Sequence, residues 1–201
     1  MHIAEGVLAW PVLAGGAAIT FGGVYMGLRS LEAYRIPQTA IMASAFFVAS
    51  LIHVPIGPAN MHLILNGLMG IVLGWACMPA ILVGLLLQSI LFQFGGLTAL
   101  GVNTVIMALP ALVCAALFRI IDPKTRRFTA ILSFVLGTGA VLFSALIAAL
   151  ALTLSGQGFV NAAKLLFVAH LPVSAIEGII TSISIGFIYK VKPEMLVDSG
   201  V

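Results

Sequence analysis

Only 7% of the 201 residues are Asp, Glu, Lys or Arg, whereas 62% are hydrophobic and the net charge is +3. A soluble protein of this length could not bury so much apolar surface, so the composition excludes a soluble enzyme or a soluble binding module. The apolar runs are long and do not alternate with polar residues, which excludes a transmembrane β-barrel. We therefore predict an all-α polytopic membrane protein with one transmembrane domain over residues 1–201.

Seven apolar segments of a length that spans a bilayer follow one another along the chain. They cover approximately residues 8–28, 39–55, 60–77, 79–95, 103–121, 128–154 and 163–190. Only Met78 and Pro79 separate the third segment from the fourth. This predicts a tight helical hairpin with proline in the first turn of its second helix.

The basic residues predict how the seven segments are oriented in the membrane. With seven spans, all of them but one fall on the same side: Arg29, Arg35, Arg119, Lys124, Arg126, Arg127, Lys190 and Lys192. Basic residues near the ends of spans mark the cytoplasmic side. We therefore expect the N-terminus outside and the C-terminus in the cytoplasm, with Lys164 as the exception on the outer side. These residues form no basic stripe, so we expect lipid and no nucleic acid as a partner.

Small residues recur every four positions in the first apolar segment, at Ala14, Ala18 and Gly22. Such a stripe allows a second helix to approach closely. The residues alone leave two interpretations open, which are packing inside the domain and a docking face for a separate membrane subunit.

The second residue of the chain, His2, has an unusual capacity to bind a metal ion. The segment before the first apolar run has no Lys or Arg, so we expect no signal peptide and a mature chain that starts at Met1. The free amine of Met1, the backbone nitrogen of His2 and its Nδ1 can then chelate one ion in five- and six-membered rings. A nitrogen from another histidine would complete a planar site, which suits Ni(II) or Cu(II) and is accepted by Co(II). Because the amide must lose its proton, binding should weaken at low pH.

His62 is the candidate for that fourth nitrogen. It lies in the sequence PIGPANMHLILNG, where two prolines and a glycine predict a sharp turn and Asn60 is a suitable helix cap. We therefore expect His62 in the first turn of a helix, directed into the outer part of the bundle. His53 would end the preceding helix, either near the metal or as a hydrogen-bonded anchor of the loop.

His170 and Glu177 are seven residues apart, so they share one face of the last helix. An acid inside a span needs a partner. Glu177 is expected to tune the site, to neutralise a cation in transit or to lock helices together. The zinc-protease motif HExxH, the nucleophile motif GxSxG, the P-loop and the CxxC motif are all absent from the sequence. Active transport would therefore need partners that supply energy.

Four segments resemble the CbiM/NikM family, which comprises the substrate-capture membrane components of energy-coupling-factor (ECF) transporters for cobalt and nickel. They are MHIAEG, HVPIGPANMHLILNGLMGIVLG, LLLQSILFQFGGLTALGVN and HLPVSAIEGIIT. The resemblance is closer to the cobalt branch. It implies an N-terminal segment folded back into a bundle of seven spans. It also implies a metal held by the Met1 amine, the His2 backbone and imidazole nitrogens, and His62.

The resemblance further implies capture of Co(II) or Ni(II) on the outer face of a prokaryotic cytoplasmic membrane. Uptake would be driven by ATP and, for cobalt, linked to cobalamin biosynthesis, with no organic cofactor. The implied partners are a coupling membrane subunit that meets the small-residue stripe, two ABC ATPase subunits and a small accessory membrane subunit. His53, Asn60, His170 and Glu177 would support the ligands or line a pathway.

Three alternatives stay open from the sequence. The first is a component specific for nickel. The second is an intramembrane enzyme with zinc bound by His62, His170 and Glu177. The third is a structural subunit or passive channel without a metal site.

Overall fold

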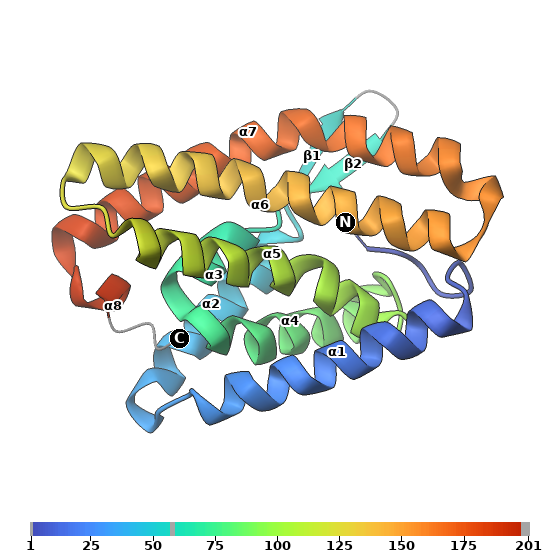
Figure 1. Ribbon diagram of the computed structural model, residues 1–201, viewed down its shortest axis with the longest axis horizontal. Helices are drawn as coiled ribbons and strands as arrows, with labels where there is room; N and C mark the ends of the chain where they lie inside the picture. Colours follow the sequence, from blue (N-terminus) through green and yellow to red (C-terminus); the bar gives the residue numbers. More distant parts are fainter. Residues whose placement is uncertain (1, 57–58, 198–201) are drawn as a thin grey trace.

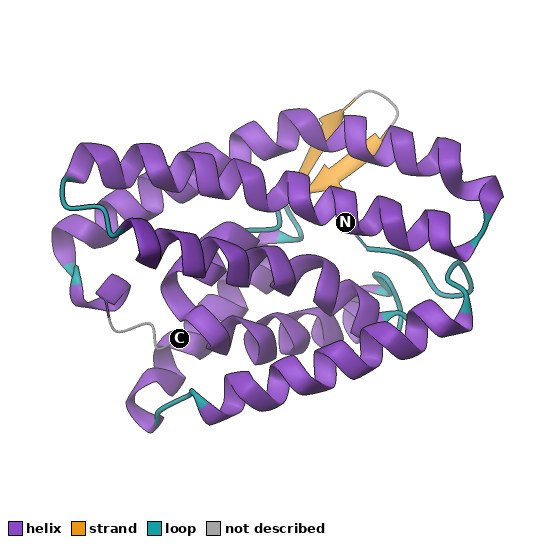
Figure 2. Ribbon diagram, in the orientation of Figure 1, coloured by secondary structure: helices purple, strands orange, loops and turns teal. Residues whose placement is uncertain are grey.

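The computed structural model describes residues 2–56 and 59–197. Met1, which the sequence analysis names as a ligand, lies outside the described residues. The chain forms a bundle of helices that lie side by side, with a small β-hairpin at its edge (Figures 1 and 2). The α-helices are α1 (Trp10–Arg29), α2 (Ile36–Ala49), α3 (Asn66–Leu73), α4 (Cys77–Phe92), α5 (Leu100–Ile121), α6 (Arg126–Ser155), α7 (Val160–Val191) and α8 (Glu194–Val197). Short 3-10 turns are η1 (Ala33–Arg35), η2 (Gly74–Ala76) and η3 (Gln157–Phe159).

Within the described residues, five helical stretches are long and apolar enough to cross a membrane. They are Trp10–Arg29, Asn66–Phe92, Leu100–Ile121, Arg126–Ser155 and Val160–Val191. Large apolar side chains cover the outside of these helices, including Phe21, Ile120 and Ile183. The chain is therefore a polytopic helical membrane protein, as the composition predicts.

A two-stranded antiparallel hairpin replaces part of two predicted helices. Strand β1 (His53–Ile56) pairs with β2 (Ala59–His62), and His53 lies opposite His62 in the register. The prediction of a helix from residue 60, capped by Asn60 and with His62 in its first turn, was wrong, and so was the helix through residue 55. The prolines explain the difference, because the residue before a proline is driven toward extended backbone and β-branched Val54 and Ile56 favour strands.

The segment after the hairpin enters the bundle, turns and comes back. Asn66 and Gly70 of α3 lie against Met107 and Ala111 of α5, while the far end of α4 brings Gln88 beside His2. Helices α3 and α4 therefore run in opposite directions (Figure 1). The break falls at η2, where Gly74 has a φ of 57°, rather than at Met78-Pro79. Pro79 does lie in the first turn of α4, as predicted.

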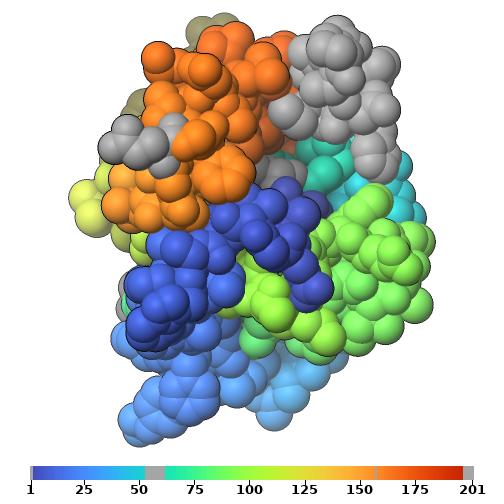
Figure 3. All heavy atoms as spheres, turned by 90° about the vertical axis from the view of Figure 1, so that its right-hand side faces the viewer, coloured from blue at the N-terminus to red at the C-terminus, as the bar shows by residue number. Residues whose placement is uncertain are grey.

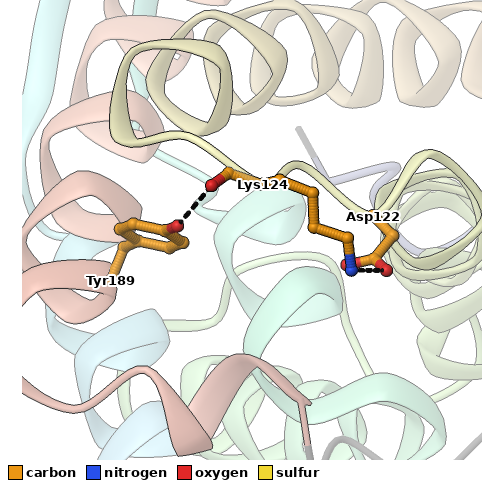
Figure 4. A network of polar contacts seen from close by, with 3 residues as sticks. All are labelled: Asp122, Lys124 and Tyr189. Atoms are coloured by element: carbon orange, nitrogen blue, oxygen red, sulfur yellow. Dashed lines mark hydrogen bonds and ion pairs between the residues drawn. The ribbon is translucent and has the colours of Figure 1, made fainter.

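The basic residues of the α5–α6 loop and of the end of α7 gather at the same end of the molecule. The hydroxyl of Tyr189 in α7 donates to the carbonyl of Lys124, at 3.0 Å, and the Lys124 ammonium forms an ion pair with Asp122 (Figure 4). Helix α1 also ends on this side of the bundle (Figure 1). This arrangement agrees with the one-sided distribution that the sequence predicts.

Helix α1 carries two different sets of small residues. A Cβ added to Gly16 would lie 2.4 Å from Cγ2 of Val102, and one added to Gly27 would lie 2.6 Å from the carbonyl oxygen of Trp75, so these glycines allow close packing inside the bundle. In contrast, Ala14, Ala18 and Gly22 are exposed. The stripe that the sequence analysis singles out therefore does not serve packing within the chain.

Candidate metal site

The N-terminal segment, residues 2–9, runs from the start of α1 back into the bundle (Figure 1). On the end of the molecule shown in Figure 3, this dark blue segment lies between the ends of α6 and α7 and the α4–α5 loop. The backbone of Ile3 is held at both polar groups, since its N–H donates to Oδ1 of Asn103 at 3.0 Å and its carbonyl accepts from Nδ2 at 3.1 Å. The N–H of Ala9 donates to Oγ of Ser155, at 3.0 Å. Helices α5 and α6 therefore fix the two ends of the segment.

Two glycines allow the α4–α5 loop to close over this segment. Gly95 and Gly96 have φ angles of 79° and 114°. A Cβ on Gly95 would lie 2.7 Å from Nδ2 of Asn103, and one on Gly96 would lie 2.0 Å from Cγ of Glu5. The N–H of Thr98 donates to Oε1 of Glu5, at 3.0 Å. The absence of a side chain therefore lets the loop approach Asn103 at Gly95 and the N-terminal segment at Gly96.

We expect Gly96→Ala to displace the N-terminal segment and to weaken Ni(II) binding by about tenfold or more, because the binding-competent arrangement is then less populated. Gly6→Ala is the matched control. Gly6 also has a positive φ, of 77°, but a Cβ there would contact nothing within 4 Å. It therefore tests the backbone cost without the clash. Calorimetric titration of both variants measures the difference, and equal losses of affinity would contradict this explanation.

The imidazoles of His2 and His62 face each other at the inner end of the segment. Nδ1 of His2 lies 3.1 Å from Nε2 of His62. The opposite nitrogen of each ring contacts a carbonyl oxygen, with Nε2 of His2 at 2.7 Å from Oε1 of Gln88 and Nδ1 of His62 at 2.9 Å from the carbonyl of Leu63. A carbonyl accepts a hydrogen bond and does not donate one, so the tautomer that suits these contacts carries the proton of each ring on the nitrogen facing away from the other ring.

In that tautomer the two nitrogens that face each other both carry lone pairs, whereas the other tautomer of either ring forms a hydrogen bond between them. Two lone pairs at this distance repel unless a proton or a cation lies between them. At metal–nitrogen distances of about 2.0 Å, two nitrogens on one ion are about 2.8 Å apart at a right angle and about 3.3 Å apart at the tetrahedral angle. The observed separation of 3.1 Å falls between these values. The separation therefore suits two ligands of one metal ion as well as a hydrogen bond between the two rings.

The surroundings of His2 favour the neutral form that binds metals. The pKa of His2 is lowered to about 3, mainly by burial and also by the positive charge of the chain terminus, whereas the hydrogen bond with Gln88 acts in the opposite direction. The imidazole is therefore unprotonated throughout the physiological pH range. A metal ion does not have to displace a proton from this ring at neutral pH.

The other candidate residues occupy different places. The backbones of His53 and Asn60 belong to the hairpin, and their side chains lie outside the described part of the structure. Nδ1 of His170 contacts the carbonyl of Leu166 in its own helix, at 2.7 Å. The Glu177 carboxylate instead reaches across the bundle to the backbone at the start of α3. In the described residues no three His, Cys, Asp or Glu side chains gather at one point, so His62, His170 and Glu177 do not form the alternative zinc site.

Sequence reasoning missed two amides that hold the site, Gln88 and Asn103. Both are buried, with 0% and 2% of their surface exposed. Gln88 contacts Nε2 of His2, and Asn103 holds the next residue along the chain. The sequence did indicate that Gln88 and Asn103 have a role, because a polar amide inside an apolar span must find a hydrogen-bond partner within the bundle.

The comparison with protein families identifies the chain. A family model described as the cobalt uptake substrate-specific transmembrane region, CbiM, matches residues 2–195. The chain belongs to the CbiM family. The resemblance found in the four sequence segments is therefore confirmed, and the chain is a cobalt or nickel transport component rather than an enzyme.

Individual relatives of this CbiM protein agree. A protein of Haemophilus influenzae named as a metal transport protein is 44% identical over 201 residues, which cover 98% of this chain and 97% of the relative. A fused nickel transport protein, NikMN, of Rhodobacter capsulatus is 36% identical over 122 residues, 58% of this chain and 35% of that protein. A crystal structure of a transition metal transporter superposes with a TM-score of 0.75 at 25% identity and covers 98% of this chain and 96% of the other. The fused relative joins a region like this chain to a further transporter component.

Proposed function

We propose that this CbiM protein captures Co(II) or Ni(II) at the outer face of a prokaryotic cytoplasmic membrane for uptake driven by ATP. The observation that carries the proposal is the pair of lone-pair nitrogens, Nδ1 of His2 and Nε2 of His62, 3.1 Å apart. Both rings are oriented by carbonyl partners, which is how histidine ligands are commonly held. The transported ion is the substrate of this site.

The proposed ligands are four nitrogens in one plane. The amine of Met1 and the backbone nitrogen of His2 would complete the set begun by the two imidazoles. Support comes from the hydrogen bonds at Ile3, which fix the peptide group that follows His2. The backbone nitrogen of His2 is only two atoms away from this peptide group, so its position is restrained as well. A planar nitrogen site favours Ni(II) and Co(II) over ions that prefer tetrahedral coordination.

The proposed topology has seven passes with the N-terminus outside. Helices α1, α2, α4, α5, α6 and α7 each cross once, and the hairpin followed by α3 makes the remaining pass from the outer side. The gathering of basic residues at the opposite end supports this orientation, since such residues mark the cytoplasmic side. The metal site then lies on the outer half of the bundle, where it can receive an ion from outside.

The proposed partners are a coupling membrane subunit, two ABC ATPase subunits and a small accessory membrane subunit. The exposed stripe of Ala14, Ala18 and Gly22 is available for close contact with a helix of the coupling subunit. A Cβ added to Gly22 would meet no atom of this chain within 4 Å, so space for a partner helix exists there.

The test is metal analysis of protein purified with a free N-terminus and offered Co(II), Ni(II) and Zn(II) in competition. We expect about one Co(II) or Ni(II) per chain, with Zn(II) strongly disfavoured because four nitrogens in a plane do not suit it. The ratio of cobalt to nickel decides between a cobalt component and a nickel-specific one. Preferential retention of Zn(II), or no retained metal, would contradict the proposal.

A further inference from the structure

Glu177 is a buried acid of α7 whose hydrogen bonds all go to the start of α3. Only 1% of its surface is exposed. Its Oε1 accepts from the N–H of Ile64, and the N–H of Leu65 contacts Oε1 at 3.1 Å and Oε2 at 2.9 Å. Both oxygens of the side chain thus face backbone N–H donors. The acid is therefore used as a hydrogen-bond acceptor inside the bundle.

The start of α3 requires such an acceptor. Leu65 precedes the helix in the left-handed region, with a φ of 54°, and its side chain forms no capping hydrogen bond. Ile64 is buried, with 1% of its surface exposed, so its N–H would otherwise lose its hydrogen bond to water.

One peptide group joins this carboxylate to the metal ligand. The peptide between Leu63 and Ile64 donates through its N–H to Glu177 and accepts through its carbonyl from Nδ1 of His62, at 2.9 Å. Hydrogen bonds at the two ends of a peptide polarise each other. Carboxylates that bond directly to metal-binding histidines fix the ring and raise its basicity. Here a peptide stands between the carboxylate and the ring.

We propose that Glu177 is a positioning residue of the metal site, acting on His62 through the Leu63–Ile64 peptide. The carboxylate holds that peptide in the orientation in which its carbonyl accepts from Nδ1 of His62, which directs Nε2 toward His2. This inference rests on the proposed function, because it gives Glu177 a role only if His62 binds the ion. It assigns to α7, a helix without a ligand, control over the geometry of the site.

The test compares Glu177→Gln with Thr181→Val. The amide keeps the size of the side chain but presents an N–H₂ to one of the two backbone N–H groups in place of an acceptor oxygen. Thr181 lies one turn further along α7, is fully buried, and its hydroxyl makes no hydrogen bond within the described residues. Titration with Ni(II) alone should show affinity about ten- to a hundredfold lower for Glu177→Gln and unchanged for Thr181→Val. The visible absorption of bound Ni(II) should shift as the His62 nitrogen is lost or distorted.

A double-variant cycle separates positioning from general stability. In a His62→Ala background, Glu177→Gln should cause no further change in the residual Ni(II) affinity, although it lowers the melting temperature in both backgrounds. If Glu177→Gln does not fold, Glu177→Asp replaces it, because this variant keeps a carboxyl group on a shorter side chain. The visible absorption of bound Ni(II) should then shift in the same direction but by less.

Three results are decisive. Wild-type affinity and spectrum in Glu177→Gln, with only a lower melting temperature, would overturn the positioning role and leave the proposed function intact. Equal losses of affinity in both backgrounds would also overturn it, because Glu177 would then act independently of His62. Absence of tight Ni(II) binding by the wild-type protein would instead overturn the proposed function itself.

Discussion

Replacement of His62 by alanine should lower the affinity for Co(II) and Ni(II) by more than about a hundredfold, above the loss typical for a group that only supports a ligand. The variant removes one of the two lone pairs that meet 3.1 Å apart and leaves Nδ1 of His2 without its counterpart. The fold should survive, because His62 lies at the end of a short edge hairpin and its ring is only partly buried. Competition with a metal-binding dye measures the affinity, and circular dichroism reports the fold.

The control is His170→Gln, which removes a buried histidine of α7. Nδ1 of His170 contacts the carbonyl of Leu166 in the same helix, so its loss should leave metal affinity close to that of the wild type. A comparable loss of affinity in both histidine variants would show that the effect is not specific to the site. Unchanged affinity in His62→Ala would remove His62 from the ligand set.

Blocking the α-amino group should have an effect as large as removing His62. Acetylation of Met1 turns a basic amine into an amide, which no longer supplies a nitrogen lone pair for the five-membered ring. We expect Ni(II) affinity to fall by more than about a hundredfold, since a ligand of the metal is lost. The measurement is titration of acetylated and unmodified protein, with mass spectrometry confirming that Met1 alone is modified.

An extended N-terminus is a second route to the same test, but its length matters. One added residue creates a chain of the form Xaa-Xaa-His, whose amine, two amides and imidazole form a four-nitrogen chelate without any other histidine. Such a variant should bind Ni(II) tightly and independently of His62. An extension of three or more residues moves the amine out of reach and should abolish tight binding. Tight binding by this longer variant that still depends on His62 would exclude the Met1 amine as a ligand.

The membrane architecture could be predicted from the sequence because it depends on local properties. Apolar runs and basic flanks need no knowledge of tertiary contacts, and each predicted apolar segment contains an α-helix in the structure. The helix prediction was wrong at residues 53–62, where the apolar segments include a β-hairpin at the edge of the bundle. Hydropathy does not distinguish a strand from a helix over so few residues, and the prolines were interpreted as a turn before a helix rather than as support for extended backbone.

The site was predictable in part for a similar reason. The chelating capacity of His2 follows from its place beside a chain terminus, which is covalent chemistry and independent of the fold. The supporting contacts are long-range, since Gln88, Asn103 and Glu177 lie 86, 100 and 113 residues from the groups that they hold. Sequence could show that buried amides and an acid need partners, but not which backbone groups these partners are.

The most direct test of the metal site is a crystal structure of the protein loaded with Ni(II), with diffraction data collected on both sides of the nickel absorption edge. We expect one anomalous peak per chain between Nδ1 of His2 and Nε2 of His62, within about 2 Å of each nitrogen. A peak elsewhere in the bundle, or none at this position in protein that retains nickel, would contradict this expectation.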